Sequence, residues 1–151
     1  ISSNYIAEVD GYNSRMDEIQ AGILRIKLKN LDKNINARKK IADFYKTNIR
    51  NDFLSPLEPI NKSRISNYLI PYVVNGNRDE FQDKLLDYGI NTNASYKVPI
   101  HLMPAYKGLG YSKNDFPFAE KLCDSIISFP IFDNMPHELF QKVVEIVNSK
   151  F

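Results

Sequence analysis

The sequence predicts an α/β fold, in the form of a small α+β-like domain whose helices cover a sheet of a few strands. Two segments, 16–31 and about 34–49, carry apolar residues at helical spacings of three and four. Segment 68–74 is rich in β-branched and aromatic residues and ends at the turn signal 75–77, which favours a strand. A helix and a second expected strand, 90–98, follow over short links, and this order is typical of helices packed on a sheet.

Composition narrows the class of partner. The 151 residues fit one domain, and an apolar fraction of 43% without a run of about 18 apolar residues gives no reason to expect a membrane partner. The net charge of +2 is nearly balanced, so a nucleic-acid partner is not expected either. Small molecules or other proteins are the expected partners. The single cysteine, Cys123, excludes a disulfide framework and is compatible with a reducing cytoplasm. Two distant histidines make a metal site improbable, and the start at Ile1 suggests a fragment.

The start of the first helix combines capping with an unexplained pair of polar residues. Ser14 is expected to cap it, with Asp17 in its first turn, and the apolar spacing predicts a helix that is largely buried. Asn13 and Arg15 flank the cap. Beside free helix amides they would suit an anion such as a phosphate or carboxylate, although an ordinary capped helix with a solvated arginine is the alternative.

The remaining elements have local signals. The basic residues Arg38, Lys39 and Lys40 are expected on the solvated face of the second helix, and 51–66 is expected to be a connector or short edge strand. Pro71 indicates an edge position or bulge in the strand 68–74.

Three later helices have expected boundaries. Asn77 should cap a helix from Arg78 to about Tyr88, with Tyr88 inward, and Gly89 should end it. Asp115 should cap a helix that runs through Phe118, Leu122, Cys123 and Ile126. A last helix, from Pro136, should bury Leu139, Val143, Ile146 and Val147.

A proline-bounded loop is the second unusual feature. Pro99 and Pro104 exclude a regular helix through 96–106 and should hold His101 in a defined place. Stiff loops that carry histidine and tyrosine often line sites, and the alternative is a histidine that bonds a local backbone carbonyl. The chain contains no P-loop, no Gly-x-Gly-x-x-Gly and no Gly-x-Ser-x-Gly motif, so the residues alone do not name a reaction.

Three blocks in order carry a family resemblance: GYNSRMDEIQAGILRIKLKNLD, PIHLMPAYKGLGY and FPFAEKLCDSIISFPIF. Together they resemble the C-terminal part of the sugar-nucleotide aminotransferases, the DegT/DnrJ/StrS family. The resemblance implies the C-terminal domain of a fold-type I pyridoxal 5'-phosphate (PLP) transferase, with long N-terminal helices on a small, mainly antiparallel sheet. It also implies a homodimer that moves an amino group, from glutamate, to a nucleotide-linked keto-sugar.

The same resemblance assigns roles residue by residue. Asn13 matches the asparagine that reaches the PLP phosphate of the neighbouring subunit, and Arg15 is assigned to an anionic part of the substrate. Tyr96 and His101 fall in the loop that borders the sugar-nucleotide site.

The Schiff-base lysine of the family lies upstream of these residues, and Lys113 is interpreted as a solvent lysine. We therefore expect 1–151 to be a single small domain without catalytic residues, inactive alone. A non-catalytic binding or oligomerisation module, or a regulatory relative that binds PLP or nucleotide-sugar as a signal, is the alternative.

Overall fold

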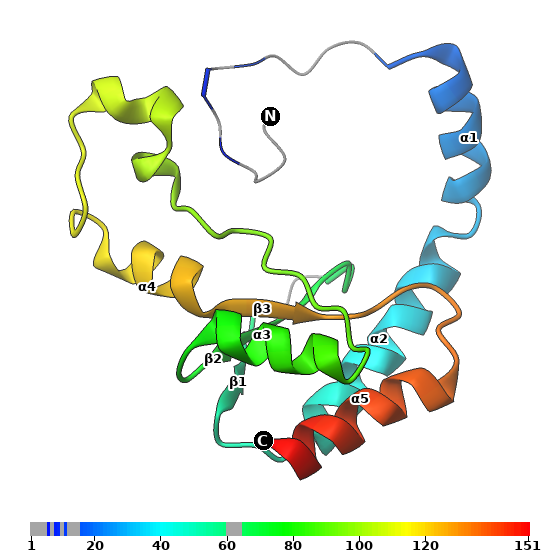
Figure 1. The fold of residues 1–151 in the computed structure, drawn as a ribbon. Coiled ribbons are helices and arrows are strands. Elements are labelled where there is room, and N and C mark those ends of the chain that lie inside the picture. The colour runs from blue at the N-terminus through cyan, green and yellow to red at the C-terminus, as the bar shows by residue number, and fades with distance from the viewer. Residues whose placement is uncertain (1–5, 7, 10, 12–15, 60–64) are drawn as a thin grey trace. The chain divides into compact units, whose positions relative to one another are not determined.

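The structure is a computed structural model that describes residues 6, 8–9, 11, 16–59 and 65–151 (Figure 1). The chain divides into two compact units, which are described separately. The sheet unit comprises Ile1–Gly11, Asn51–Leu57 and Pro71–Pro130, and the helical unit comprises Tyr12–Arg50, Glu58–Ile70 and Ile131–Phe151. The expected combination of helices with a small antiparallel sheet is confirmed. In the part of the chain that is described, no helix is both long and apolar enough to cross a membrane.

The sheet has three strands in the order β1-β2-β3: β1 (Leu54–Pro56), β2 (Ile70–Val74) and β3 (Ile126–Phe129). β1 and β2 pair antiparallel, with Leu54 opposite Val74. The edge position expected from Pro71 is wrong, because β2 is the central strand. Pro71 is tolerated there because it is the second residue of the strand and precedes the positions paired with β1, so its missing N–H removes none of those bonds.

The second expected strand, 90–98, is also wrong. It contributes a single antiparallel bridge, in which the amide of Asn93 donates to the Ser128 carbonyl at 3.0 Å and Ser128 donates back at 2.7 Å. The polar residues of this segment favour turns, and the chain leaves β3 after that one bridge.

Helix α3 (Arg78–Asp87) follows its sequence signals closely. The Asn77 side chain accepts from the amides of Asp79 and Glu80, and Gly89 adopts a φ of 76° directly after the helix. Phe81 and Leu85, on one face, are buried. Tyr88, expected inward, is 42% exposed because it lies past the last turn.

Helix α4 (Pro117–Ser125) begins differently from the prediction. The Asp115 carboxylate does not cap it and instead accepts from the amide of Ser112 at 2.7 Å. Glu120, in the first turn, accepts from the amides of Asn114 and Phe116. Phe118 is 89% exposed, because the register set by this start turns it to the outer face.

The helical unit is built from α1 (Glu18–Leu28), α2 (Leu31–Asn48) and α5 (His137–Lys150). Phe44 of α2 packs edge-on against Phe140 of α5, with ring centroids 5.0 Å apart. Asn148 closes the end of α2, since its side chain donates to the Asn48 carbonyl and accepts from the Arg50 amide, both at 2.8 Å.

The buried face of α5 is close to the one expected. Val143, Val144 and Val147 are buried, and Ile146 is half-buried. Leu139 was expected inside and is 46% exposed, because it lies in the first turn of the helix, before the buried face begins.

The expectation that Arg38 lies on a solvated basic face of α2 is wrong. It pairs with Asp133, and its Nε donates to the Ser66 carbonyl at 3.0 Å. Its side chain is only 13% exposed, because these two partners come from segments that fold over α2.

Helix α1 differs most from expectation. It begins at Glu18 with Asp17 as its N-cap, and the Gln20 side chain accepts from the Asp17 amide at 3.4 Å; Ser14, the expected cap, lies outside the described residues. No residue of α1 is buried, and Ile19 is 78% exposed. The expected burial is therefore wrong for this chain, because apolar periodicity marks a face to be covered without stating what covers it.

Candidate functional site

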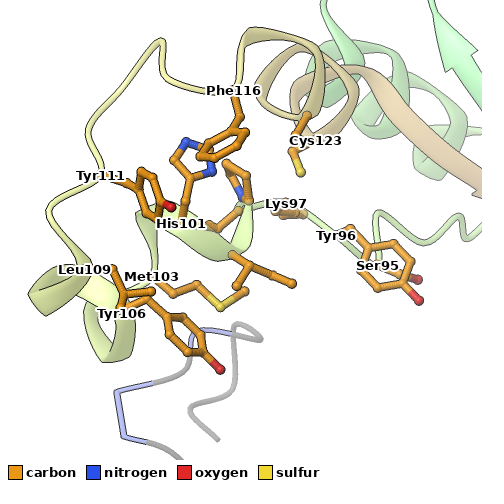
Figure 2. A pocket seen from close by; sticks show the side chains of 14 residues that line it. Ser95, Tyr96, Lys97, His101, Met103, Tyr106, Leu109, Tyr111, Phe116 and Cys123 are labelled. Carbon is orange, nitrogen blue, oxygen red and sulfur yellow. The ribbon is translucent and has the colours of Figure 1, made fainter.

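A cavity of about 700 Å³ lies in the sheet unit, between the loop after residue 94 and helix α4 (Figure 2). Its walls are mostly aromatic and apolar. The aromatic residues are Tyr96, His101, Tyr106, Tyr111 and Phe116. A concave surface of this size, with a few polar groups among apolar walls, is typical of a small-molecule site.

Two prolines shape the loop on one side of the cavity. Pro99 and Pro104 introduce two short 3-10 helices, η1 (Ile100–Leu102) and η2 (Pro104–Leu109). The amide of Leu102 donates to the Pro99 carbonyl at 3.0 Å, and η2 ends at Gly110 with a φ of 78°. A proline presets the φ that such a turn requires, so the sequence itself makes this loop stiff.

His101 is held at the meeting point of η1 and α4. Its Nε2 lies 3.1 Å from Glu120 Oε1, and the two side chains are only 8% and 10% exposed. Its ring packs against Phe116 with centroids 4.8 Å apart, and Phe116 in turn contacts Tyr111 at 5.1 Å. Figure 2 shows these three side chains grouped at one end of the cavity. The histidine therefore bonds a carboxylate rather than the local carbonyl that was the alternative.

The charge of Glu120 follows from its surroundings. Burial on its own would raise the pKa of this carboxyl group, but hydrogen bonds from the Asn114 amide, from His101 and from the Phe116 amide together hold its pKa below the ordinary value. Glu120 is therefore an ionised, acceptor-only group at neutral pH.

A thiol also reaches the cavity. Cys123 of α4 is 9% exposed, and burial above all raises its pKa, with the charge of Asp124 acting in the same direction. The thiol is therefore protonated and unreactive at neutral pH.

The residues expected to form the site are distributed as follows. Tyr96 and His101 both line the cavity, and Tyr96 is 63% exposed. Asn13 and Arg15 lie outside the described residues. Lys113 is exposed and is not among the cavity-lining residues, as a solvent lysine would be.

Sequence reasoning missed two important members. The sequence signal for a site role of Glu120 is weak, since an acidic residue in the first turn of a helix is common and is normally explained by the helix dipole. Phe116 carries no recognisable sequence signal. It lies between a glycine-rich loop and a helix, and no local pattern predicts its contact with a histidine 15 positions earlier in the chain.

Comparison with known proteins places these features in a family. The model of the "DegT/DnrJ/EryC1/StrS aminotransferase family" matches residues 2–148. The chain is 35% identical to the "dTDP-3-amino-3,4,6-trideoxy-alpha-D-glucose transaminase" of Micromonospora megalomicea subsp. nigra, over 96% of this chain and 40% of that protein. It is also 35% identical to the "Erythromycin biosynthesis sensory transduction protein EryC1" of Saccharopolyspora erythraea, with the same two coverages.

A solved structure agrees with the fold. The structure of DesV from S. venezuelae, in complex with a ketimine intermediate, superposes with a TM-score of 0.85 at 29% identity, over 99% of this chain and 40% of that one. The chain thus spans about 40% of the length of the relatives that it matches.

Proposed function

Because the chain belongs to the DegT/DnrJ/EryC1/StrS aminotransferase family, we propose that the complete protein is a PLP-dependent aminotransferase of amino-sugar biosynthesis. It transfers an amino group, from glutamate, to a keto-sugar linked to a nucleotide. Residues 1–151 form its C-terminal small domain, and the domain with the Schiff-base lysine lies in the part of the protein outside this chain. The observation that carries the proposal is the aromatic cavity around His101, within the residues matched to the family.

The chemistry of the cavity suits a nucleotide-linked sugar. Flat aromatic side chains stack against a base or the apolar face of a sugar ring, and tyrosine hydroxyl groups bond its polar edge. Tyr96 and His101 are the residues to which we assign substrate contacts. Tyr96 is exposed enough to meet a ligand, and His101 is fixed by Glu120 and Phe116.

The described lining does not fit PLP by itself. Among the described residues that line the cavity, Lys97 is the only lysine or arginine, and none is an aspartate or glutamate that could pair with a pyridine nitrogen. We therefore assign the cofactor to a site completed elsewhere in the protein, and no step of the reaction is derived through it. Asn13 would reach the phosphate of that cofactor, and Arg15 an anionic group of the substrate, as expectations from the family.

A homodimer is the expected assembly. Helix α1 presents Ile19, Ile26 and Leu28 at exposures of 66–78%, and apolar side chains at that density are usually covered by protein. Cytoplasmic location is expected as well, in keeping with the free thiol of Cys123.

The test uses the complete protein supplied with PLP and nitrogen-15 glutamate. We expect stoichiometric formation of 2-oxoglutarate from glutamate alone, and transfer of the label to the sugar when dTDP-linked keto-sugars are added. Lys113→Ala, outside the cavity, is the matched control and should react like wild type. Failure to form 2-oxoglutarate would contradict the proposal. A protein that binds dTDP but forms no 2-oxoglutarate would favour the non-catalytic binding module instead.

A further inference from the structure

Glu120 lies behind the wall of the cavity, and one atom of its side chain holds three segments together. Its Oε1 accepts from the Asn114 amide at 2.8 Å, from His101 Nε2 at 3.1 Å and, in a longer contact, from the Phe116 amide at 3.4 Å. Glu120 is not among the described residues that line the cavity. It therefore acts on a bound ligand only through the residues that it holds.

The contact with Glu120 requires a hydrogen on Nε2 of His101. An ionised carboxylate can only accept hydrogen bonds, so Nε2 must be the donor and must carry the hydrogen. A neutral imidazole with its hydrogen on Nε2 has a bare lone pair on Nδ1, and this lone pair points away from Glu120. Phe116 packs against the ring in a tilted arrangement, with an interplanar angle of 58°, and this contact limits rotation of the imidazole. Both the tautomer and the orientation of His101 are thus set from outside the cavity.

We propose that Glu120 is a positioning residue of the substrate site: it holds His101 as the Nε2–H tautomer, so that Nδ1 faces the cavity as an acceptor for a hydroxyl or N–H group of the ligand. This inference rests on the proposed function, because it treats the cavity as the nucleotide-sugar site. It adds a selection rule: the ligand group that meets His101 must be a hydrogen-bond donor.

The geometry also says which property of Glu120 matters. The three contacts described above converge on Oε1, so the placement of one acceptor oxygen is required. Glu120→Gln keeps that oxygen in place and removes the charge. Glu120→Asp keeps the charge and withdraws it by one methylene. Positioning therefore predicts that glutamine substitutes better than aspartate, whereas simple charge pairing with the histidine predicts the reverse order.

The first measurement requires no ligand. In the complete protein labelled with nitrogen-15 histidine, His101 should give a slowly exchanging Nε2–H signal, assigned by its loss in His101→Phe. We expect the signal to persist in Glu120→Gln and to disappear by solvent exchange in Glu120→Asp. A wild-type protein with the hydrogen on Nδ1, or a signal kept by aspartate and lost in glutamine, would overturn the proposal. The wild-type and Glu120→Gln spectra decide the matter even if the aspartate variant folds poorly.

The second measurement uses dTDP as the probe and reads its dissociation constant. His101→Phe and Glu120→Asp should each weaken binding about tenfold, the loss of one hydrogen bond. Because Glu120 acts through His101, the double variant should bind no more weakly than either single one. Independent effects, about a hundredfold together, would overturn the proposal. If the wild type shows the Nε2–H signal but does not bind dTDP, the proposed function fails while the positioning of His101 by Glu120 stands.

Discussion

Replacing Arg78 with methionine should loosen the sheet unit behind the cavity. Arg78 is the first residue of α3 and is only 6% exposed. Its Nη1 donates to the carbonyls of Cys123 and Ile126, each at 3.1 Å, and its Nε pairs with Asp79 at 2.6 Å. These bonds join the start of α3 to the end of α4 and the start of β3, where the cavity wall that carries Cys123 is anchored.

The magnitude follows from the two buried carbonyl bonds. A hydrogen bond to a charged group contributes about 1.5–3 kcal/mol, so the pair contributes about 3–6 kcal/mol. Removing the guanidinium group also removes the cost of burying its charge, and methionine refills much of the volume. The net loss should therefore be about 2–4 kcal/mol.

Hydrogen exchange of the complete protein, followed by mass spectrometry, measures this change locally. Opening of α4 and β3 should become about 30- to 1,000-fold more frequent in Arg78→Met, the equivalent of 2–4 kcal/mol. Lys84→Met on the same helix removes a 55% exposed lysine that pairs with Glu80, and it should change exchange by less than about fivefold. If the amides of α4 and β3 exchange as slowly in Arg78→Met as in Lys84→Met, the bonds from Arg78 to the two carbonyls do not hold these elements in place.

Three further predictions concern other sites. Gly76→Ala should destabilise the sheet unit by about 1–3 kcal/mol in urea unfolding, because its Cβ would lie 2.5 Å from the Phe53 ring; an unchanged midpoint would mean that the ring moves aside without cost. Alkylation of Cys123, quantified by peptide mass spectrometry, should be slow at neutral pH and should speed up only as the pH approaches the raised pKa of the thiol. Bound dTDP should slow the alkylation further, whereas a rate equal to that of an ordinary exposed thiol would place Cys123 outside the cavity. In the complete protein Asn13→Ala should weaken PLP retention more than His101→Ala, and equal retention by both variants and wild type would count against the phosphate assignment.

Local rules explain why some boundaries could be predicted. Asn77 and Gly89 delimit α3 because a side-chain cap and a left-handed glycine act within a few residues of the chain. The prediction that Asp115 caps α4 is wrong, because its carboxylate accepts from the Ser112 amide and the helix begins after Phe116 instead. Glu120 of α4 accepts from the Asn114 amide, which precedes the helix. Which side chain accepts from which backbone amide depends on the path of the loop, and residue spacing in the sequence does not predict that path.

The sequence by itself determined the family, the combination of helices with a small sheet, and the stiffness of the loop that carries His101, because motif order, periodicity and proline act along the chain. Only the tertiary structure decided that Glu120 and Phe116 meet that histidine and that α1 keeps its apolar residues exposed. The physical reason is common to both, because hydrogen bonds and apolar burial depend on what lies opposite a side chain in space. The partners of His101 lie 15 and 19 positions further along the chain, and the described part of the chain buries no residue of α1.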